Sequence, residues 1–425
     1  MRKITASLNA SGCLRNARKI KTGRHLAPIA RLAALLLALL VAFPVSAFIS
    51  AETTEAADTV TLTVYNWGQY ISDGTDGYVD VVAAFEEKYP NIKVNYITFD
   101  SNETMYTKLK TGGASYDVII PSDYMIEKLI NEDMLLELDY SNIPNFELVD
   151  DSFKNMSYDP ENKYSVPYTW GYVGIIYNTK YVNEEDAVDW ELLWNTTYAG
   201  KILMFDNCRD AYAIAEAALG YSINTEDEDE LNAATDKLKA QKNLVQSYVM
   251  DQIFDKMERG EAWIAPYYAG DYLFMLEENE DLAFYAPDGY NLFVDAACIP
   301  TCAEHKYEAE LFINFLCEPE ICGENLEYLG YSTPISAAKE YMDEEMSANE
   351  IAYPPAELLS KGEAYSALST EANQLMNDLW LSVKTNDSQL SVYIWVTLGA
   401  LIVVIALWLF LKIRKARRIA RRCTH

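Results

Sequence analysis

YDVIIPSDYMIEKLINEDML, residues 116–135, joins a short apolar run to an amphipathic helical pattern. The run 118–120 has three apolar residues in succession, which is typical of a strand that is covered on both faces of a parallel sheet. From Ser122 onward, apolar residues recur at helical spacing. The stretch therefore predicts one strand followed directly by one helix.

Two similar units stand before this one. Residues 59–65 (TVTLTVY) and 92–99 (IKVNYITF) have the composition of strands, and each is followed by a helical stretch, 77–90 and 102–112. A β-α-β-α-β-α order predicts an α/β fold in which a parallel sheet carries helices on both faces.

The alternation resumes in the second half of the body. We expect strands at GIIYN, KILMF, AWIAPYY and LAFYAP, and helices over 211–219 and 227–242. From residue 300 to about 384 the pattern predicts a helical region.

Two segments, 166–178 and 292–300, have the character of chain passages between two lobes. The predicted domains are a signal peptide or signal anchor at 1–51, lobe one at 58–166 with 295–340 returning to it, lobe two at 167–294 with part of 341–387, a transmembrane helix at 392–411 and a basic cytoplasmic tail at 412–425.

The two ends of the chain carry the membrane signals. Residues 32–43 are an apolar run between a basic stretch and small residues ending at Ala47 and Ala51, a pattern typical of a secretory signal. Residues 392–411 form an uncharged run of 20 residues, enough for a helix of about 30 Å, and KIRKARRIARR follows it. Basic flanks stay in the cytoplasm, so we expect residues 52–388 on the extracytoplasmic face of the cell membrane, with a single C-terminal anchor.

The charge is divided into blocks along the chain. All 64 acidic residues lie between Glu52 and Asp387 with only 19 of the 34 basic residues, which gives this region a formal charge of −45. Such a surface repels nucleic acid and attracts cations, so we expect no nucleic-acid partner. An acidic body can also serve solubility alone, so the charge by itself does not identify a ligand.

No motif for catalysis or cofactor binding is found in the exported body. Its one histidine, His305, has a hydrophilic context, so nucleophilic catalysis lacks an evident base. There is no phosphate-binding loop, no GxGxxG after a strand, no HExxH and no EF-hand loop. We therefore expect a protein that is not an enzyme, with no cofactor and no metal.

The exported body has five cysteines, an odd number that does not form a complete disulfide framework. Cys317 and Cys322, or Cys302 with either, could pair in oxidising surroundings, and free buried thiols are the other possibility.

Aromatic rings and acids recur where the predicted strands end. The segments concerned are YNWGQY (65–70), FDSNETMY (99–106), PSDY (121–124), FDNCRDAY (205–212) and PYYAGDY (266–272). In an open parallel sheet, ligands bind beyond the carboxyl ends of the strands. A cleft with this lining suits an elongated organic cation, because ring faces attract cations and carboxylates hold ammonium groups. The same rings and acids could bind or cleave sugars.

Over residues of about 60 to 385, the chain resembles the substrate-binding proteins of spermidine/putrescine ABC transporters. The motifs that carry the resemblance are YNWGQY, SNETMYTKLKTGGASYDVIIPSDY, YSVPYTWG, WELLWNTTYAGKILMFDNCRDAY, DAACIP, INFLCEPEI and LGYSTP. The resemblance implies a two-lobed, type II periplasmic-binding-protein-like fold that closes on a polyamine and delivers it to an ABC permease, without a chemical step. The alternative is a sugar-binding or carboxylate-based sugar-cleaving surface protein on the same fold.

The resemblance also implies a set of ligand-binding residues. They are Trp67, Tyr70, Ser122, Tyr124, Asn207, Asp210, Tyr268, Phe293, Asp295, Tyr331 and Tyr365. The chain departs from the family at Asn207, where the family has an acid, and at Tyr268, where a tryptophan is frequent.

Several of these residues have an ordinary structural alternative. The aromatic residues could be parts of the core, Ser122 could cap the following helix, and Asp210 could form a surface ion pair with Arg209. Asp295 lies between apolar residues, where an unpaired acid is costly, which favours a role as a cation anchor.

Overall fold

The computed structural model describes residues 59–385 apart from residue 114, together with residues 395–405, 408 and 412. The described strands form one sheet with the order β2-β1-β3-β9-β4-β7-β5-β6, and β8 pairs with β4. The strands are β1 (Val60–Trp67), β2 (Ile92–Phe99), β3 (Val118–Ile119), β4 (Ser165–Asn178), β5 (Ile202–Phe205), β6 (Val245–Val249), β7 (Ile264–Tyr268), β8 (Leu282–Tyr285) and β9 (Leu292–Cys298).

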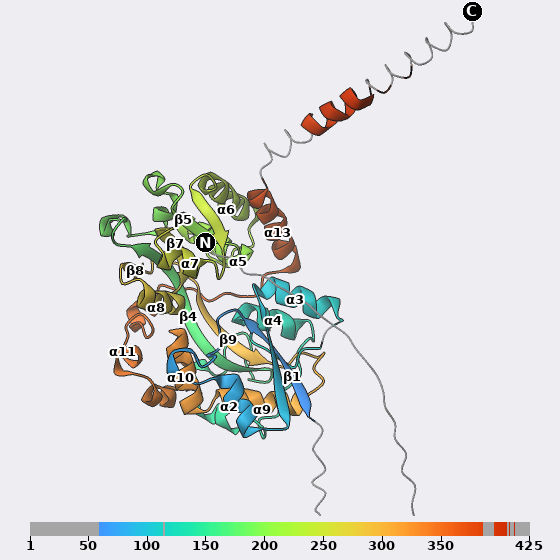
Figure 1. Cartoon of the computed structure of the whole chain (residues 1–425), viewed down its shortest axis with the longest axis vertical. Helices are drawn as coiled ribbons and strands as arrows, with labels where there is room; N and C mark the ends of the chain where they lie inside the picture. The colour runs from blue at the N-terminus through green and yellow to red at the C-terminus, as the bar shows by residue number, and fades with distance from the viewer. Residues whose placement is uncertain (1–58, 114, 386–394, 406–407, 409–411, 413–425) are drawn as a thin grey trace, which may run out of the picture. The chain divides into compact units, whose positions relative to one another are not determined.

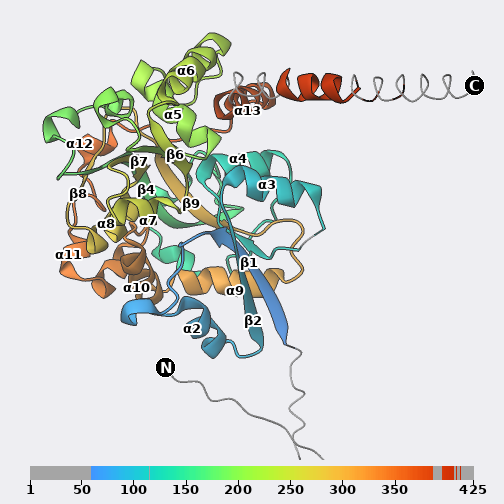
Figure 2. The ribbon, with the colours of Figure 1, turned by 45° about the horizontal axis from the view of Figure 1, so that its top comes forward.

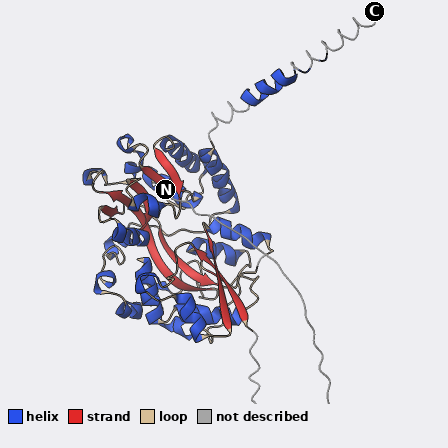
Figure 3. Ribbon diagram, in the orientation of Figure 1, coloured by secondary structure: helices blue, strands red, loops and turns tan. Residues whose placement is uncertain are grey.

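Lobe one begins with the three β-α units predicted from the sequence. β1 pairs in parallel with β2 and with β3, and the helices that follow them are α2 (Val81–Lys88), α3 (Asn102–Thr111) and α4 (Asp123–Asn131). α3 starts at a capping box in which Ser101 and Thr104 satisfy each other's backbone N–H groups, a local reason for the helix to begin there. Figure 3 shows the strands of this lobe flanked by helices.

The parallel pairing predicted for the first three β-α units is confirmed, but the sheet as a whole is mixed. β9 runs antiparallel to β3 and β4, and β4 runs antiparallel to β7 and β8. β4 and β9 are the two predicted passages, and the chain travels out along one and returns along the other, so their directions are opposite. In Figure 1 these two strands run side by side between the elements around β1 and those around β5.

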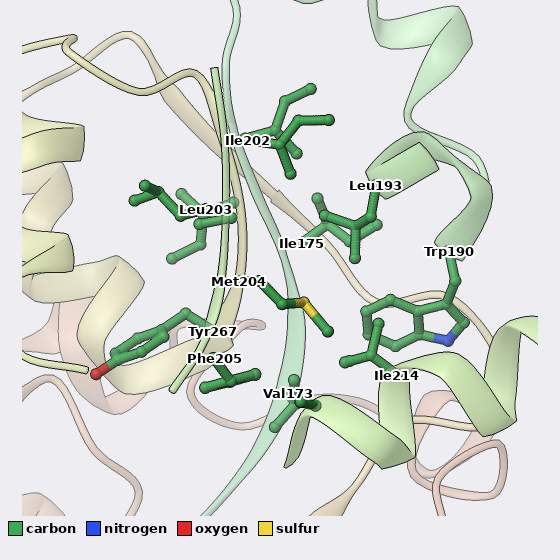
Figure 4. Close-up of a cluster of buried hydrophobic side chains, with 14 of the residues drawn as sticks. Val173, Ile175, Trp190, Leu193, Ile202, Leu203, Met204, Phe205, Ile214 and Tyr267 are labelled. Atoms are coloured by element: carbon green, nitrogen blue, oxygen red, sulfur yellow. The ribbon is translucent and has the colours of Figure 1, made fainter. Parts of the chain in front are cut away.

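Lobe two is built on β5, which pairs in parallel with β6 and β7. Its helices are α5 (Cys208–Leu219), α6 (Glu228–Gln241), α7 (Ile253–Glu258) and α8 (Ala269–Glu278). All four side chains of β5 are buried, and they pack with Trp190, Ile214 and Tyr267 (Figure 4). β6 was not predicted from the sequence, because its VQSYV run is short and mostly half-buried.

The region after residue 300 is only partly helical. It contains α9 (Lys306–Leu316), α10 (Pro319–Leu329), α11 (Glu344–Ser347), α12 (Ala356–Leu359) and α13 (Thr370–Lys384). Between α10 and α13 the backbone is mostly irregular, since Gly330 adopts a left-handed conformation with φ 73° and Pro334, Pro354 and Pro355 interrupt helical pairing. In the view of Figure 2, α9 and α10 lie near β1 and α2.

Several predictions concern residues that the structure describes only in part or not at all. The predicted signal, 1–51, lies outside the described residues, as does the tail 412–425 apart from its first residue. The predicted transmembrane segment, 392–411, is described in part, and no helix among the described residues is long and apolar enough to span a membrane.

The five body cysteines are Cys208, Cys298, Cys302, Cys317 and Cys322, and all of them are free thiols. Of the two possibilities that the sequence left open, the structure has free thiols, although Cys302 is exposed rather than buried.

Candidate binding cleft

A cavity lies between the two lobes at the strand ends. Its walls come from both lobes and from the passage strand β9. All eleven predicted ligand-binding residues line it: Trp67, Tyr70, Ser122, Tyr124, Asn207, Asp210, Tyr268, Phe293, Asp295, Tyr331 and Tyr365. Residues that are far apart in the sequence therefore line the same cavity.

The turn after β1 aims two rings into this cavity. Gln69 adopts a left-handed conformation with φ 49°, which reverses the chain between Trp67 and Tyr70. The carbonyl oxygen of Tyr70 accepts hydrogen bonds from the Asn66 amide (3.3 Å) and from the Tyr168 hydroxyl (2.8 Å). The turn is thus held from both sides.

Asp295 of β9 is the most informative acid of the cavity. It is only 4% exposed, and its Oδ2 accepts a hydrogen bond of 2.6 Å from the Tyr70 hydroxyl. Its Oδ1 is buried without a hydrogen-bond partner. Burial raises the pKa of Asp295 to about 6, against the lowering effect of the neighbouring Ser122 and Tyr70 side chains. A buried carboxylate oxygen without a donor is costly unless a ligand supplies one.

Asp210 in the first turn of α5 is satisfied differently. Its Oδ2 accepts from the Tyr268 hydroxyl (2.6 Å) and from the Asn207 amide (2.8 Å), and its Oδ1 accepts from the Tyr365 hydroxyl (2.9 Å). Burial raises its pKa to about 6, while the two tyrosine hydroxyls lower it.

The expected alternative for Asp210, a surface ion pair, is not what the structure contains. Asp210 is 5% exposed and its neighbour Arg209 is 3% exposed. The Arg209 guanidinium lies instead 4.5 Å from the ring centroid of Tyr365 and 5.7 Å from that of Tyr124. Its Nη2 donates to the Asn224 side-chain oxygen (2.7 Å) and to the Ser366 carbonyl (3.3 Å).

Asn207 has two local functions. Its side-chain oxygen caps α5 by accepting from the backbone N–H of Arg209 (2.9 Å), and its amide donates to Asp210. An acid at this position could still cap α5, but it could not donate a hydrogen bond to Asp210. The amide of Asn207 does both.

Ser122 precedes α4 but makes no side-chain cap. Its hydroxyl accepts a hydrogen bond of 3.1 Å from the Asn102 amide, which also donates to the Tyr124 hydroxyl. Ser122 is therefore the N-cap residue of α4 by position, as the alternative has it, but its side chain does not make the cap.

The rings of the cavity contact one another edge to face. Tyr70 meets Tyr331 at 5.2 Å between centroids, Tyr124 meets Tyr365 at 5.4 Å, and Tyr268 meets Phe293 at 5.5 Å. Such pairs present both ring faces and ring edges, and the faces attract cations.

Sequence reasoning missed part of the lining. The further residues are Gly68, Asn102, Met250, Asp251, Phe254, Tyr267, Asp271 and Asn291. Asn102, Tyr267 and Asp271 lie inside strand-end segments that the sequence already singled out. Asp251 follows β6. Because that strand was not predicted from the sequence, Asp251 was not recognised as a strand-end residue.

Asp271 is a third acid with a tyrosine donor. The Tyr331 hydroxyl donates to its Oδ2 at 3.1 Å, and burial raises the pKa of Asp271 to about 8. The cavity therefore combines several rings with four carboxyl groups and is suited to a cationic ligand.

Two lobes joined by paired passage strands, with a polar cavity between them, define the class of solute-binding proteins. Residues 80–354 match the family described as bacterial extracellular solute-binding protein, and the chain belongs to this family.

Named relatives narrow the comparison. The chain is 34% identical over 310 residues to the spermidine/putrescine-binding periplasmic protein of Salmonella typhimurium, a match that covers 72% of this chain and 87% of the relative. It is similar to the structure of a putative spermidine/putrescine ABC transporter from Listeria monocytogenes, with 38% identity, a TM-score of 0.73, and coverage of 76% of this chain and 99% of that one. A spermidine/putrescine ABC transporter substrate-binding protein from Streptococcus pneumoniae also has 38% identity, with a TM-score of 0.64 and coverage of 76% and 98%.

Proposed function

We propose that this protein is the extracytoplasmic binding component of an ABC importer and that it captures a polyamine, spermidine or putrescine, between its lobes for delivery to a membrane permease. The names of the relatives supply the ligand class. These names favour a polyamine over a sugar as the ligand.

The unpartnered Oδ1 of Asp295 is the observation that carries the proposal. A ligand ammonium at this oxygen would supply the missing donor and form a charge-assisted hydrogen bond. Asp210, close enough for its charge to act on Asp295, adds a second anionic group at the same end of the cavity. The rings then cover the methylene chain and exclude water from it.

Closure of the lobes completes the site. We place the lobes at the boundaries predicted from the sequence, with β4 and β9 as the connections. The closed protein with bound ligand differs in shape from the open protein without ligand. A permease can distinguish these two shapes.

Binding to the purified full-length protein tests the function. Isothermal titration with putrescine, spermidine, spermine and a set of sugars is expected to give a dissociation constant of about 1 μM or tighter for a polyamine, equivalent to about 8 kcal/mol. Heat with a sugar and none with any polyamine would overturn the proposal.

We also propose that residues 392–411 tether the protein to the membrane and that its body faces the outside. Residues 395–405 are helical, and their large apolar side chains are exposed, for example Trp395 at 73% and Val403 at 66%. Exposed apolar surface of this kind favours contact with lipid. Protease added to intact cells should degrade the body, and full protection would contradict the orientation.

A further inference from the structure

Tyr365 lines the cavity from a segment without regular secondary structure. α12 ends at Leu359 and α13 begins at Thr370, and the chain between them meets the sheet at an isolated bridge between Glu363 and Asn291. Neither a helix nor a strand therefore fixes the direction in which the Tyr365 side chain points. Its place in the cavity wall must depend on contacts with the rest of the molecule.

The Arg209 side chain makes such contacts with both the ring and the backbone of this segment. Its guanidinium lies 4.5 Å from the ring centroid of Tyr365 and 5.7 Å from that of Tyr124. Its Nη2 donates to the carbonyl of Ser366, the residue after Tyr365, at 3.3 Å, and to the Asn224 side-chain oxygen at 2.7 Å. The same Asn224 oxygen accepts from the Ser366 N–H at 2.8 Å. One arginine thus contacts the Tyr365 ring and helps to hold the residue beside it.

Arg209 is buried without the partners that a guanidinium ordinarily has. Its Nε and Nη1 have no hydrogen-bond partner in the part of the chain that the structure describes, and neither has the carboxyl group of the fully buried Glu216 on the same helix, α5. Burial raises the pKa of Glu216 to about 8, and the charge of Arg209 lowers it, so the two groups act on each other without a hydrogen bond. Burying a charge in this way is costly. Contact of the guanidinium with the two tyrosine rings offsets part of that cost.

The Tyr365 hydroxyl connects Arg209 to the ligand site. It donates to Asp210 Oδ1 at 2.9 Å, so Asp210 would lose one of its three donors if the Tyr365 ring turned away. Burial raises the pKa of Asp210 to about 6, Tyr268 and Tyr365 lower it, the Glu103 charge raises it and the Arg209 charge lowers it. Arg209 therefore influences Asp210 through the Tyr365 ring and also directly by its charge.

We propose that Arg209 is a positioning residue of the polyamine site and that its guanidinium holds the Tyr365 ring where the hydroxyl donates to Asp210. The inference rests on the proposed function and deepens it. Arg209 is not among the residues that line the cavity, so it acts on the ligand through Tyr365 rather than by contact. The planar guanidinium stacks on an aromatic face, whereas a lysine ammonium is a compact point charge on a flexible stem.

Arg209→Lys tests this role, because it keeps the charge and removes the planar group. Titration calorimetry on the full-length protein is expected to show spermidine binding weakened about fivefold or more. Arg259→Lys, the same change at an exposed arginine that pairs with Asp255, is the matched control and should leave the affinity within about twofold. An unchanged affinity in a folded Arg209→Lys protein would overturn the proposal.

A double-mutant cycle with Tyr365→Leu distinguishes positioning from a general structural effect. Tyr365→Leu weakens spermidine binding by itself. If Arg209 acts through the Tyr365 ring, adding Arg209→Lys to Tyr365→Leu should change the affinity less than about twofold. An equal loss with and without the Tyr365 ring would overturn the positioning role.

The pH dependence of spermidine binding provides a second measurement. Arg209→Met combined with Glu216→Leu removes both buried charges, so that neither is left unpaired and the fold should be retained. The pH midpoint of binding should then move to a higher value, because Asp210 loses a positive charge that lowers its pKa, whereas Arg209→Lys should leave the midpoint in place. An unmoved midpoint in the double variant would contradict the action of Arg209 on Asp210. Absence of polyamine binding to the unmutated protein would overturn the proposed function itself, which keeps the two failures distinct.

Discussion

At the residue scale, the cavity depends on carboxylates that are buried with neutral donors rather than with bases. Each tyrosine hydroxyl stabilises a charged oxygen and leaves the net negative charge in place. Asp210 is fully supplied with three donors, whereas Asp295 retains a free oxygen. The difference makes Asp295 the residue whose environment changes most when a cation arrives.

We expect Asp295→Asn to weaken polyamine binding at least about tenfold, because the amide has no charge for the ammonium and charge-assisted hydrogen bonds are worth about 1.5–3 kcal/mol. Isothermal titration measures the effect. Asp288→Asn, which removes an exposed acid paired with Lys361, is the control for net charge. An unchanged affinity in a folded Asp295→Asn protein would show that Asp295 is not an anchor.

Binding is also expected to weaken as the pH falls from 7 to 5. Burial raises the pKa values of Asp210 and Asp295 to about 6, so protonation in this range removes the charges that the ligand needs. Titrations in buffers of different ionisation enthalpy should show proton release on binding near pH 6. Equal affinity at pH 5 and pH 7 would contradict the role of Asp210 and Asp295 as charged anchors of the ligand.

The stability of the free protein should respond with the opposite sign. Because these two pKa values are higher in the folded state than the ordinary value of 3.8, the folded protein holds more protons between about pH 4 and 6. The contribution of Asp210 and Asp295 to stability therefore decreases as the pH rises through this window, and ligand binding at neutral pH offsets the loss.

At the scale of elements, α5 connects fold and site. Its N-cap is Asn207 and its first turn holds Asp210, so the helix begins at the cavity edge and positions the carboxylate. The resemblance drew attention to Asn207 as a missing acid. The structure gives that residue a capping role and a donor role, neither of which spacing alone could show.

Asn207→Ala should destabilise the protein by about 1 kcal/mol through loss of the cap, and it should also weaken polyamine binding because Asp210 loses a donor. Asp227→Ala removes the N-cap of α6, which is not part of the cavity lining, and is the matched control. It should lower the melting temperature similarly without changing affinity. If both variants bound polyamine with the same affinity, Asn207 would have no role in ligand binding.

At the scale of the whole molecule, the cavity exists because two lobes meet. Asp251 against Gly68 is a contact between lobes, and the same cavity has ring walls from each of them. If the lobes opened, the ligand-contacting residues of one lobe would move away from those of the other, and the acids would be exposed to water. Hydration of the carboxylates lowers the free-energy cost of keeping them charged when no ligand is bound.

Saturating spermidine is therefore expected to make the protein more compact. Small-angle scattering should give a smaller radius of gyration with spermidine than without it, because the ammonium groups neutralise acids that repel each other in the closed form. A titration with sodium chloride at equal ionic strength controls for screening. A radius that does not change although the ligand binds would contradict closure as the binding mechanism.

The sequence by itself determined the β-α units of lobe one and the recurrence of rings and acids at strand ends, because hydrophobic periodicity and strand-end chemistry are local. Its resemblance to a known family supplied eleven of the residues that line the cavity. Only the tertiary structure decided the antiparallel passage strands, the strand β6 and the place of Asp251 against Gly68. These features depend on contacts between segments far apart in the chain, for which a local pattern contains no signal.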